Sequence, residues 1–212
     1  MDPVPPPPNP RWLKFLVDRL FALVFTVLLS PIHVAILLAV KLEDLFTGQV
    51  LASPFYFEPR VSGGKQFAVI KFRVLKPSRL KALRAEAGGD IKLVKHHEFD
   101  PTAVTRVGDV LRRFYLDELP QIWNVLVGHM SFVGPRPIPL IDEERLHLFG
   151  ECGMRSGLAG VFQYTKGDPR PMRDRDLDYY HEYYRRGQLS LLWLDLSLMA
   201  RTALKMGKGE GL

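Results

Sequence analysis

The chain has little cysteine: Cys152 is the only one among its 212 residues. A single cysteine excludes an internal disulfide framework and agrees with a reducing, cytosol-facing environment. The sequence also lacks a P-loop, a GxGxxG motif, a metal-type cluster of Cys and His, and an internal repeat. Apolar residues make up 47% and charged residues 25% of the chain. These fractions exclude a disordered chain and a many-span transporter, and the length fits one folded domain with an appendage.

Acidic residues are fewer than basic ones, 23 against 29, which gives a net charge of +6. Residues 60–115 carry much of this surplus, with 13 Lys or Arg against 5 Asp or Glu. A basic surface favours anionic partners such as nucleic acid, phosphorylated substrates or acidic lipid headgroups, and it equally suits a solvated face. Nucleic-acid binding rests on charge alone, without a recognisable binding motif, so we expect no nucleic-acid partner.

Charged residues are missing altogether from the 21 positions between Arg19 and Lys41. As a helix this segment would measure about 31 Å, close to the thickness of the hydrocarbon core of a bilayer. A cleaved signal peptide is disfavoured, because apolar residues continue past Pro31 without a small-x-small cleavage site. Ser30 and Pro31 lie at the midpoint, where proline removes a backbone donor and predicts a kink. The composition leaves two arrangements open, a spanning helix and a re-entrant hairpin that bends at Ser30-Pro31.

The remaining chain predicts an α+β fold that is mostly helical, with a few short strands. Residues 2–10 contain six prolines and are expected to form an extended tail. Three local patterns predict two strands and a short basic helix: Gln66–Phe72 and Gly160–Tyr164 as strands, and Ser78–Ala87 as the helix. The leucine-rich segment Leu189–Leu204, with Trp193, fits either a core helix or an amphipathic helix in the headgroup layer.

The segment Leu111–Pro137 carries the candidate chemistry. Proline is tolerated in the first turn of a helix, so Pro120 predicts a helix that begins just before it, with Asp117 at or near the N-cap. An apolar stripe follows at helical spacing and Gly128 supplies the stop; the stripe consists of Leu119, Ile122, Trp123 and Leu126. Asp117 and Glu118 would then lie at a helix N-terminus, where free N–H groups favour phosphate.

Two guanidinium groups precede these acids, because Arg112 and Arg113 lie five and four residues before Asp117. Guanidinium groups bind phosphate oxygens bidentately, and a carboxylate can attack phosphorus while its neighbour Glu118 holds Mg2+. The stiff turn around Arg136 offers a second anion anchor, although a plain surface turn explains the same residues. The pattern indicates phosphoryl chemistry.

Together these segments resemble the bacterial sugar transferase family, the monotopic polyprenyl-phosphate phosphoglycosyl transferases that initiate glycan assembly. The resemblance extends from about residue 12 to the C-terminus, and the apolar segment with its central Ser-Pro precedes the motifs. The motifs, in chain order, are Lys71-Phe72-Arg73, Leu111-Arg112-Arg113, Leu116-Asp117-Glu118-Leu119-Pro120-Gln121, Asn124-Val125-Leu126 and Ser131-Phe132-Val133-Gly134-Pro135-Arg136-Pro137.

This resemblance implies a mechanism and a set of site residues. Asp117 would attack the sugar-bearing phosphate of a UDP-sugar, expel UMP and carry the phosphosugar until undecaprenyl phosphate accepts it. Glu118 would help hold Mg2+, and Arg112 and the Pro-Arg-Pro turn would contact the substrate phosphates or the nucleotide. The other implied substrate-binding residues are Lys71, Arg73, Arg113, Gln121, Pro135, Arg136 and Pro137.

The resemblance also implies a location and a domain plan. It divides the chain into a Pro-rich tail (1–10), a re-entrant membrane helix-hairpin bent at Ser30-Pro31 (11–46) and a cytosolic transferase domain with interfacial amphipathic helices (47–212). The expected site is the cytoplasmic face of the bacterial inner membrane, with membrane lipid, a UDP-sugar and undecaprenyl phosphate as partners. The sequence leaves open the donor sugar, the glycan and a homo-oligomer. The alternative from another class is a non-catalytic membrane anchor or adaptor, which would tolerate Asp117→Asn.

Two segments depart from the family pattern. Residues 152–160 lack the proline usual in the family's Pro-Gly-hydrophobic-Thr-Gly stretch. Tyr179-Tyr180 and Tyr183-Tyr184 are alternative matches to the family's single tyrosine pair, so Asp178 is a further, weaker candidate.

Overall fold

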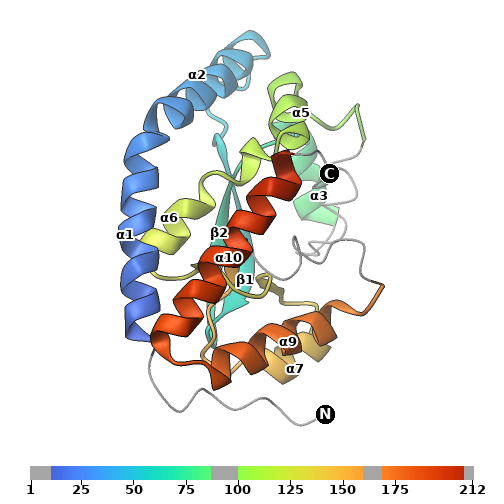
Figure 1. Ribbon diagram of the computed structural model, residues 1–212. Coiled ribbons are helices and arrows are strands. Elements are labelled where there is room, and N and C mark those ends of the chain that lie inside the picture. The colour runs from blue at the N-terminus through green and yellow to red at the C-terminus, as the bar shows by residue number, and fades with distance from the viewer. Residues whose placement is uncertain (1–10, 87–99, 160–168, 208–212) are drawn as a thin grey trace. The chain divides into compact units, whose positions relative to one another are not determined.

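The computed structural model describes residues 11–86, 100–159 and 169–207 (Figure 1). The described helices are α1 (Trp12–Leu28), α2 (Ser30–Phe46), α3 (Pro77–Glu86), α5 (Arg106–Arg113), α6 (Gln121–Leu126), α7 (Glu143–Phe149), α9 (Met172–Arg185), α10 (Gln188–Gly207) and the 3-10 turn η1 (Leu116–Glu118). The described strands are β1 (Phe55–Ser62), β2 (Lys65–Phe72), β3 (Ser131–Val133), β4 (Ile138–Pro139) and β5 (Gly157–Ala159). The predicted α+β, mostly helical class is confirmed.

The chain divides into two compact units. Unit 1 comprises the described residues within Met1–Leu23, Pro59–Phe67 and Asn124–Leu212. Unit 2 comprises Val24–Glu58 and the described residues within Ala68–Trp123. The β1–β2 hairpin contributes to both units, because each of its strands begins in one unit and ends in the other.

The strands form two small sheets. The first has the order β2-β1-β4, in which β1 and β4 are antiparallel and Arg60 lies opposite Pro139. In the second, β3 and β5 are parallel and Ser131 lies opposite Gly157. A Cβ atom on Gly134, directly after β3, would lie 2.4 Å from the carbonyl oxygen of Arg155. Only glycine allows the two chains to approach this closely.

The sequence predicted four elements, of which three are present in the structure and the fourth falls on residues that the structure does not describe. The strand expected at Gln66–Phe72 is β2, and the helix expected at Ser78–Ala87 is α3, which begins at Pro77. The leucine-rich segment Leu189–Leu204 is helical within α10. The strand expected at Gly160–Tyr164 lies outside the described residues.

The predicted kink at Ser30-Pro31 is confirmed. Helix α1 ends at Leu28, helix α2 begins at Ser30, and the two axes are bent by 57°. Pro31 has no N–H for the carbonyl of Val27, and the hydroxyl of Ser30 donates to that oxygen instead, at 2.7 Å. None of the described helices is long and apolar enough to qualify alone as a membrane span, whereas α1 and α2 qualify together as a bent pair.

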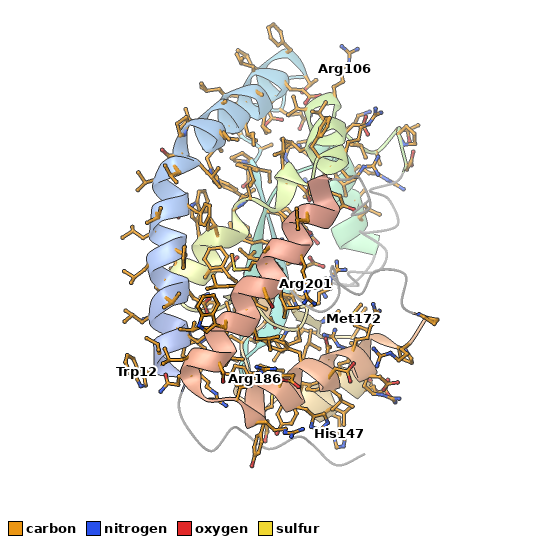
Figure 2. The ribbon with its side chains drawn as sticks, in the orientation of Figure 1. Trp12, Arg106, His147, Met172, Arg186 and Arg201 are labelled. Atoms are coloured by element: carbon orange, nitrogen blue, oxygen red, sulfur yellow. The ribbon has the colours of Figure 1, made fainter. Side chains whose placement is uncertain are left out.

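Helices α1 and α2 have an inverted polarity. Apolar side chains are exposed along both helices, and Trp12 at the start of α1 points away from the ribbon (Figure 2). The buried positions of α1 include Lys14 and Asp18, and those of α2 include His33 and Asp44. A helix that faces water has the opposite arrangement, with apolar residues inside and charged residues outside.

The apolar core of unit 2 positions the segment with the candidate chemistry. Ile36 and Val40 of α2 pack with Phe72 of β2 and Leu111 of α5. Leu116 and Leu119, which flank Asp117 and Glu118, pack against the same cluster. The turn that carries the two acids is therefore anchored on both sides.

Candidate active site

The turn around Asp117 differs from the predicted helix start. Asp117 and Glu118 belong to the 3-10 turn η1, and helix α6 begins only at Gln121. Pro120 has no N–H, and its neighbours close i→i−3 hydrogen bonds, from Leu119 N to Leu116 O and from Trp123 N to Pro120 O. The expected N-cap position for Asp117 is therefore wrong. Helix α6 has six residues and begins four positions after Asp117, so its dipole does not explain the site.

The stop signals on both sides of this segment are clear in the backbone. Tyr115 has a left-handed conformation with φ of 56°, which ends α5 and redirects the chain into η1. Gly128, the predicted end of α6, has φ of 86°. A left-handed residue other than glycine is uncommon and costs free energy that the surrounding packing must offset.

Lys71 lies among three carboxylates of unit 2. Its Nζ donates to Oε1 of Glu118 at 2.8 Å, and the charges of Glu58 and Asp117 also act on it. Burial alone would lower the pKa of Lys71, but the three carboxylates outweigh burial and raise that pKa above its usual value. Lys71 therefore stays protonated, and its charge offsets that of the two acids of η1.

Glu58 is the member of this cluster that the sequence did not indicate. It lies on β1 and is 2% exposed. The available signal was the alternation of the polar residues Glu58, Arg60 and Ser62 along one segment. The structure places them on β1 and buries all three side chains. Such a pattern marks a polar inward face, yet it does not tell which partner that face meets.

Asp117 and Glu118 fit a magnesium ion by the chemistry of their donors. Asp117 is buried, whereas about a third of the Glu118 side chain (35%) is exposed. Mg2+ prefers oxygen ligands and usually takes one or two carboxylates together with waters and substrate phosphates. Among the described residues, no three His, Cys, Asp or Glu side chains come together as a metal-binding group. The residues present thus fit a partly hydrated ion held by Glu118 together with the substrate.

The two arginines before the turn both bind an acid of their own helix. Nη2 of Arg112 lies 3.1 Å from Oδ1 of Asp109, and Nη2 of Arg113 lies 2.6 Å from Oδ2 of the same residue. The side chain of Arg113 is 67% exposed. The structure places both on α5, the helix that leads into η1, with Asp109 as their observed carboxylate partner.

Arg73 has a structural role in this structure. Nη2 of Arg73 binds both carboxylate oxygens of Asp44, at 2.6 and 2.8 Å, and both side chains are buried. The other nitrogens donate to the backbone oxygens of Ser53 and Leu75. These bonds tie the end of β2 to the end of α2, and the substrate-binding role expected of Arg73 stays a prediction. Gln121 is also buried, at the start of α6.

Pro135, Arg136 and Pro137 belong to unit 1, whereas Lys71 and Asp117 belong to unit 2. Pro135 is buried, and Arg136 and Pro137 are half-buried. The carbonyl oxygen of Pro135 accepts a hydrogen bond from Gly157 N at 2.9 Å. The turn continues β3 and is fixed to the start of β5.

Unit 1 also contains a buried polar network that the sequence did not indicate. Nζ of Lys14 donates to Asp195 Oδ2 at 2.6 Å and to the carbonyl oxygen of Val133 at 3.0 Å. The hydroxyl of Tyr179 donates to Asp195 Oδ1 at 2.8 Å. Burial raises the pKa of Asp195, and Lys14 and Tyr179 oppose that rise. A lysine among apolar residues in α1 was the available signal, but its partner lies 181 positions away.

The structure places both tyrosine pairs on α9, and it gives α10 one buried face and one exposed face. Tyr179, Tyr180 and Tyr183 of α9 are buried, whereas the carboxylate of Asp178 is exposed and pairs with Arg170. On α10, Leu191 and Leu198 are buried together with Asp195. The exposed apolar residues of α10 are Leu189, Trp193, Leu196 and Leu204. One face of α10 packs inside, as expected of a core helix, and the other face is exposed and apolar. Its placement in the headgroup layer stays a prediction.

Comparison with known proteins identifies the family. The model of the bacterial sugar transferase family matches residues 9–209, and the chain therefore belongs to that family.

Three relatives show what the chain is similar to. The UDP-N-acetylgalactosamine-undecaprenyl-phosphate N-acetylgalactosaminephosphotransferase of Aeromonas hydrophila is 30% identical, over 97% of this chain and 46% of its own. The UDP-glucose:undecaprenyl-phosphate glucose-1-phosphate transferase of Escherichia coli K12 is 32% identical, over 92% of this chain and 40% of its own. The exopolysaccharide production protein ExoY of Rhizobium meliloti is 34% identical, over 70% of this chain and 66% of its own. The chain spans less than half the length of the first two relatives.

Proposed function

We propose that this protein transfers a sugar-1-phosphate from a UDP-sugar to undecaprenyl phosphate, with Asp117 as the nucleophile. Membership of the bacterial sugar transferase family supports this proposal. The names of the relatives from A. hydrophila and E. coli, which specify undecaprenyl phosphate and a UDP-sugar, support it further. The observation that carries it is the pair Asp117-Glu118 on an anchored turn beside the charged Lys71.

The reaction consists of two displacements at one phosphorus atom. An oxygen of Asp117 attacks the sugar-bearing phosphorus of the donor, the phosphoanhydride bond breaks, and UMP leaves with the bonding electrons. An oxygen of undecaprenyl phosphate then attacks the same phosphorus, and the carboxylate of Asp117 leaves. One phosphoanhydride replaces another, so neither step consumes ATP or requires a net proton transfer.

The surrounding residues manage the charge of this reaction. The ammonium group of Lys71 reduces the repulsion between the carboxylate of Asp117 and an anionic donor. Glu118, which the exposed fraction of its side chain leaves accessible, would hold Mg2+. When bound, Mg2+ neutralises the negative charge of the donor phosphates. We assign Arg112, Arg113 and Arg136 to phosphate contacts on the family resemblance.

We also propose that α1 and α2 form a re-entrant hairpin in the cytoplasmic leaflet of the bacterial inner membrane. Their exposed apolar side chains and buried charged side chains suit a lipid environment. The hydroxyl of Ser30 donates a hydrogen bond to the carbonyl oxygen of Val27, which Pro31 cannot do. This leaves one fewer unsatisfied polar group in the hydrocarbon. A hairpin would keep the soluble donor and the lipid acceptor on the same side of the membrane.

The test is release of UMP by the purified protein with a panel of UDP-sugars, Mg2+ and undecaprenyl phosphate. We expect sustained release with at least one donor, and a mass adduct of one phosphosugar on the intact protein when the acceptor is omitted. Asp117→Asn should lower release by at least about 10³-fold and abolish the adduct. Glu182→Gln, which removes a surface carboxylate of α9, is the matched control and should stay active. Unchanged release by Asp117→Asn would rule out the proposed nucleophile.

A further inference from the structure

The turn Pro135-Arg136-Pro137 is held by hydrogen bonds at every carbonyl. Two prolines already restrict its backbone, because each fixes its own φ and the residue before proline is restricted too. Each of the three carbonyl oxygens then accepts a bond from a different part of unit 1. Gly157 N donates to Pro135 O at 2.9 Å, Arg145 Nη2 donates to Arg136 O at 2.8 Å, and Arg60 Nη1 donates to Pro137 O at 3.4 Å.

Two of these donors are buried arginine side chains. Arg60 and Arg145 are each 4% exposed. Buried side chains of this kind have little freedom to move, so hydrogen bonds from them restrict the backbone of the turn. The side chain of Arg136 is the half-buried group that this rigid backbone presents.

Arg145 is itself held by a buried carboxylate of another helix. Its Nε and Nη2 bind Oδ2 of Asp176 at 2.9 and 2.7 Å, and Asp176 is 1% exposed. Asp142, the N-cap residue of α7, accepts from the backbone N–H of Arg145 at 3.2 Å. Arg145 thus lies between α9, which supplies Asp176, and the turn, which supplies the carbonyl of Arg136.

Helices α7 and α9 lie side by side in unit 1 (Figure 1), which is why an arginine of one can reach an aspartate of the other. In Figure 2, Met172 marks the first residue of α9, and His147 lies in the last turn of α7. A second ion pair joins the same two helices at the surface, between Nη1 of Arg173 and Oε1 of Glu144. Of these two pairs, only Arg145–Asp176 also contacts the turn, through the hydrogen bond from Arg145 to the carbonyl oxygen of Arg136.

From this geometry we propose that Arg145 and Asp176 are positioning residues that fix Arg136 for binding a substrate phosphate. The proposal rests on the proposed function, which assigns Arg136 to a phosphate contact. A guanidinium that is already in place loses less conformational entropy on binding an anion than one on a mobile loop. We call the pair Arg145–Asp176, together with its hydrogen bond to the carbonyl of Arg136, the brace. Loss of the brace should therefore weaken donor binding more than it slows the chemical step.

The experiment compares Arg145→Lys, Asp176→Asn and the control Glu144→Gln by UMP release, using the donor that the panel identifies. Arg145→Lys keeps a positive charge for Asp176, but its single ammonium group lacks the fork that also reaches the carbonyl of Arg136. We expect the KM for the donor to rise about tenfold in Arg145→Lys and Asp176→Asn, with kcat within about twofold of wild type. Glu144→Gln breaks the surface pair between the same helices and should leave both constants unchanged.

A double-mutant cycle decides whether the brace acts through Arg136. Adding Arg145→Lys or Asp176→Asn to Arg136→Ala should produce no further rise in KM, because the side chain that they position is already absent. Additive effects would overturn the proposal and leave Arg145 a purely structural residue. An unchanged donor KM in both single variants would overturn it as well.

Hydrogen exchange separates failure of this inference from failure of the proposed function. The segment 131–138 should exchange faster in Arg145→Lys than in wild type, and at the wild-type rate in Glu144→Gln. If the wild-type protein released no UMP with any donor, the proposed function would fall and the catalytic meaning of the brace with it. Equal exchange in Arg145→Lys and wild type would overturn the brace itself, whatever the activity.

Discussion

At the scale of single residues, charge is balanced by a few buried cations. The charge of Lys71 offsets those of Glu118, Glu58 and Asp117, and Arg73 forms an ion pair with Asp44. Three carboxylates around one site would repel each other and an anionic donor, and one ammonium group offsets much of that repulsion. The cation thus supports both the fold and the proposed phosphoryl transfer.

Replacement of Lys71 by Met should destabilise the protein by about 3 kcal/mol, because one partner of a partly buried ion pair is removed. The double variant Lys71→Met/Glu58→Gln should regain part of this loss, since it leaves one negative charge fewer without a counter-charge. Thermal unfolding of the detergent-solubilised protein measures both. Equal melting temperatures of wild type and Lys71→Met would contradict the assigned role.

Asp176 should make stability depend on pH. Burial raises its pKa from 3.8 to about 6, while the charges of Arg145 and Arg175 oppose that rise and Asp142 adds to it. Between pH 4 and about 6 the folded protein binds this proton more tightly than the unfolded chain does. The stability that Asp176 contributes therefore falls as the pH rises through this window, by about 3 kcal/mol at most.

The measurement is the melting temperature of wild type minus that of Asp176→Asn, taken from pH 4 to pH 7. We expect this difference to decrease by several degrees over the window. Asp178→Asn removes an exposed carboxylate from the same helix and serves as the control. A difference that does not change with pH would refute the raised pKa.

At the scale of elements, local signals predicted what local chemistry decides. The kink at Pro31, strand β2 and the stop at Gly128 follow from residues within a turn or two, and all three are present. The η1 turn was mistaken for a helix start because it depends on the left-handed backbone of Tyr115, which lies between Leu111 and Leu116, two residues of the unit 2 core. Local sequence carries no sign of such a tertiary effect.

The kink leads to a prediction about topology. Pro31→Ala restores an N–H donor for the carbonyl of Val27 and should straighten the hairpin into a spanning helix. A cysteine introduced at Asp2 should then react with a membrane-impermeant thiol reagent in intact cells, whereas in the parent hairpin it should not. Cys152 is buried and adds little background.

Pro54→Ala, outside the helices, is the control and should leave the introduced cysteine protected. Labelling in the parent protein would show that the hairpin is wrong. Protection in Pro31→Ala would show that the proline does not determine the topology.

At the scale of the whole molecule, partners distant in sequence were beyond prediction. Asp117 and Glu118 were found because they are adjacent and belong to a recognisable motif. Glu58 and Asp195 were not found, because each meets its cationic partner, Lys71 or Lys14, only after the chain has folded. Residue types can suggest such partners, but only the fold selects them.

The exposed apolar face of α1 and α2, rather than the net charge of +6, should hold the protein on the membrane. We expect it to stay in the membrane fraction at about 1 M salt, which screens surface charge. Leu20→Lys/Val27→Lys places two charges on exposed positions of α1, and each should cost about 2–3 kcal/mol in lipid.

The double lysine variant should therefore shift measurably into the soluble fraction. Val110→Lys, at an exposed apolar position of α5, is the matched control and should behave as wild type. Release of wild type by salt alone would indicate electrostatic attachment instead.

The interleaving of the two units limits how this protein can be dissected. The chain passes from one unit to the other four times, after Leu23, Glu58, Phe67 and Trp123. A cut at any one of these joints divides unit 1 between the two fragments, and a cut after Glu58 or Phe67 divides unit 2 as well, so no single cut leaves both units intact. Chimaeras with other members of the family should therefore exchange whole units at all four joints, or single side chains, rather than an N-terminal or C-terminal half.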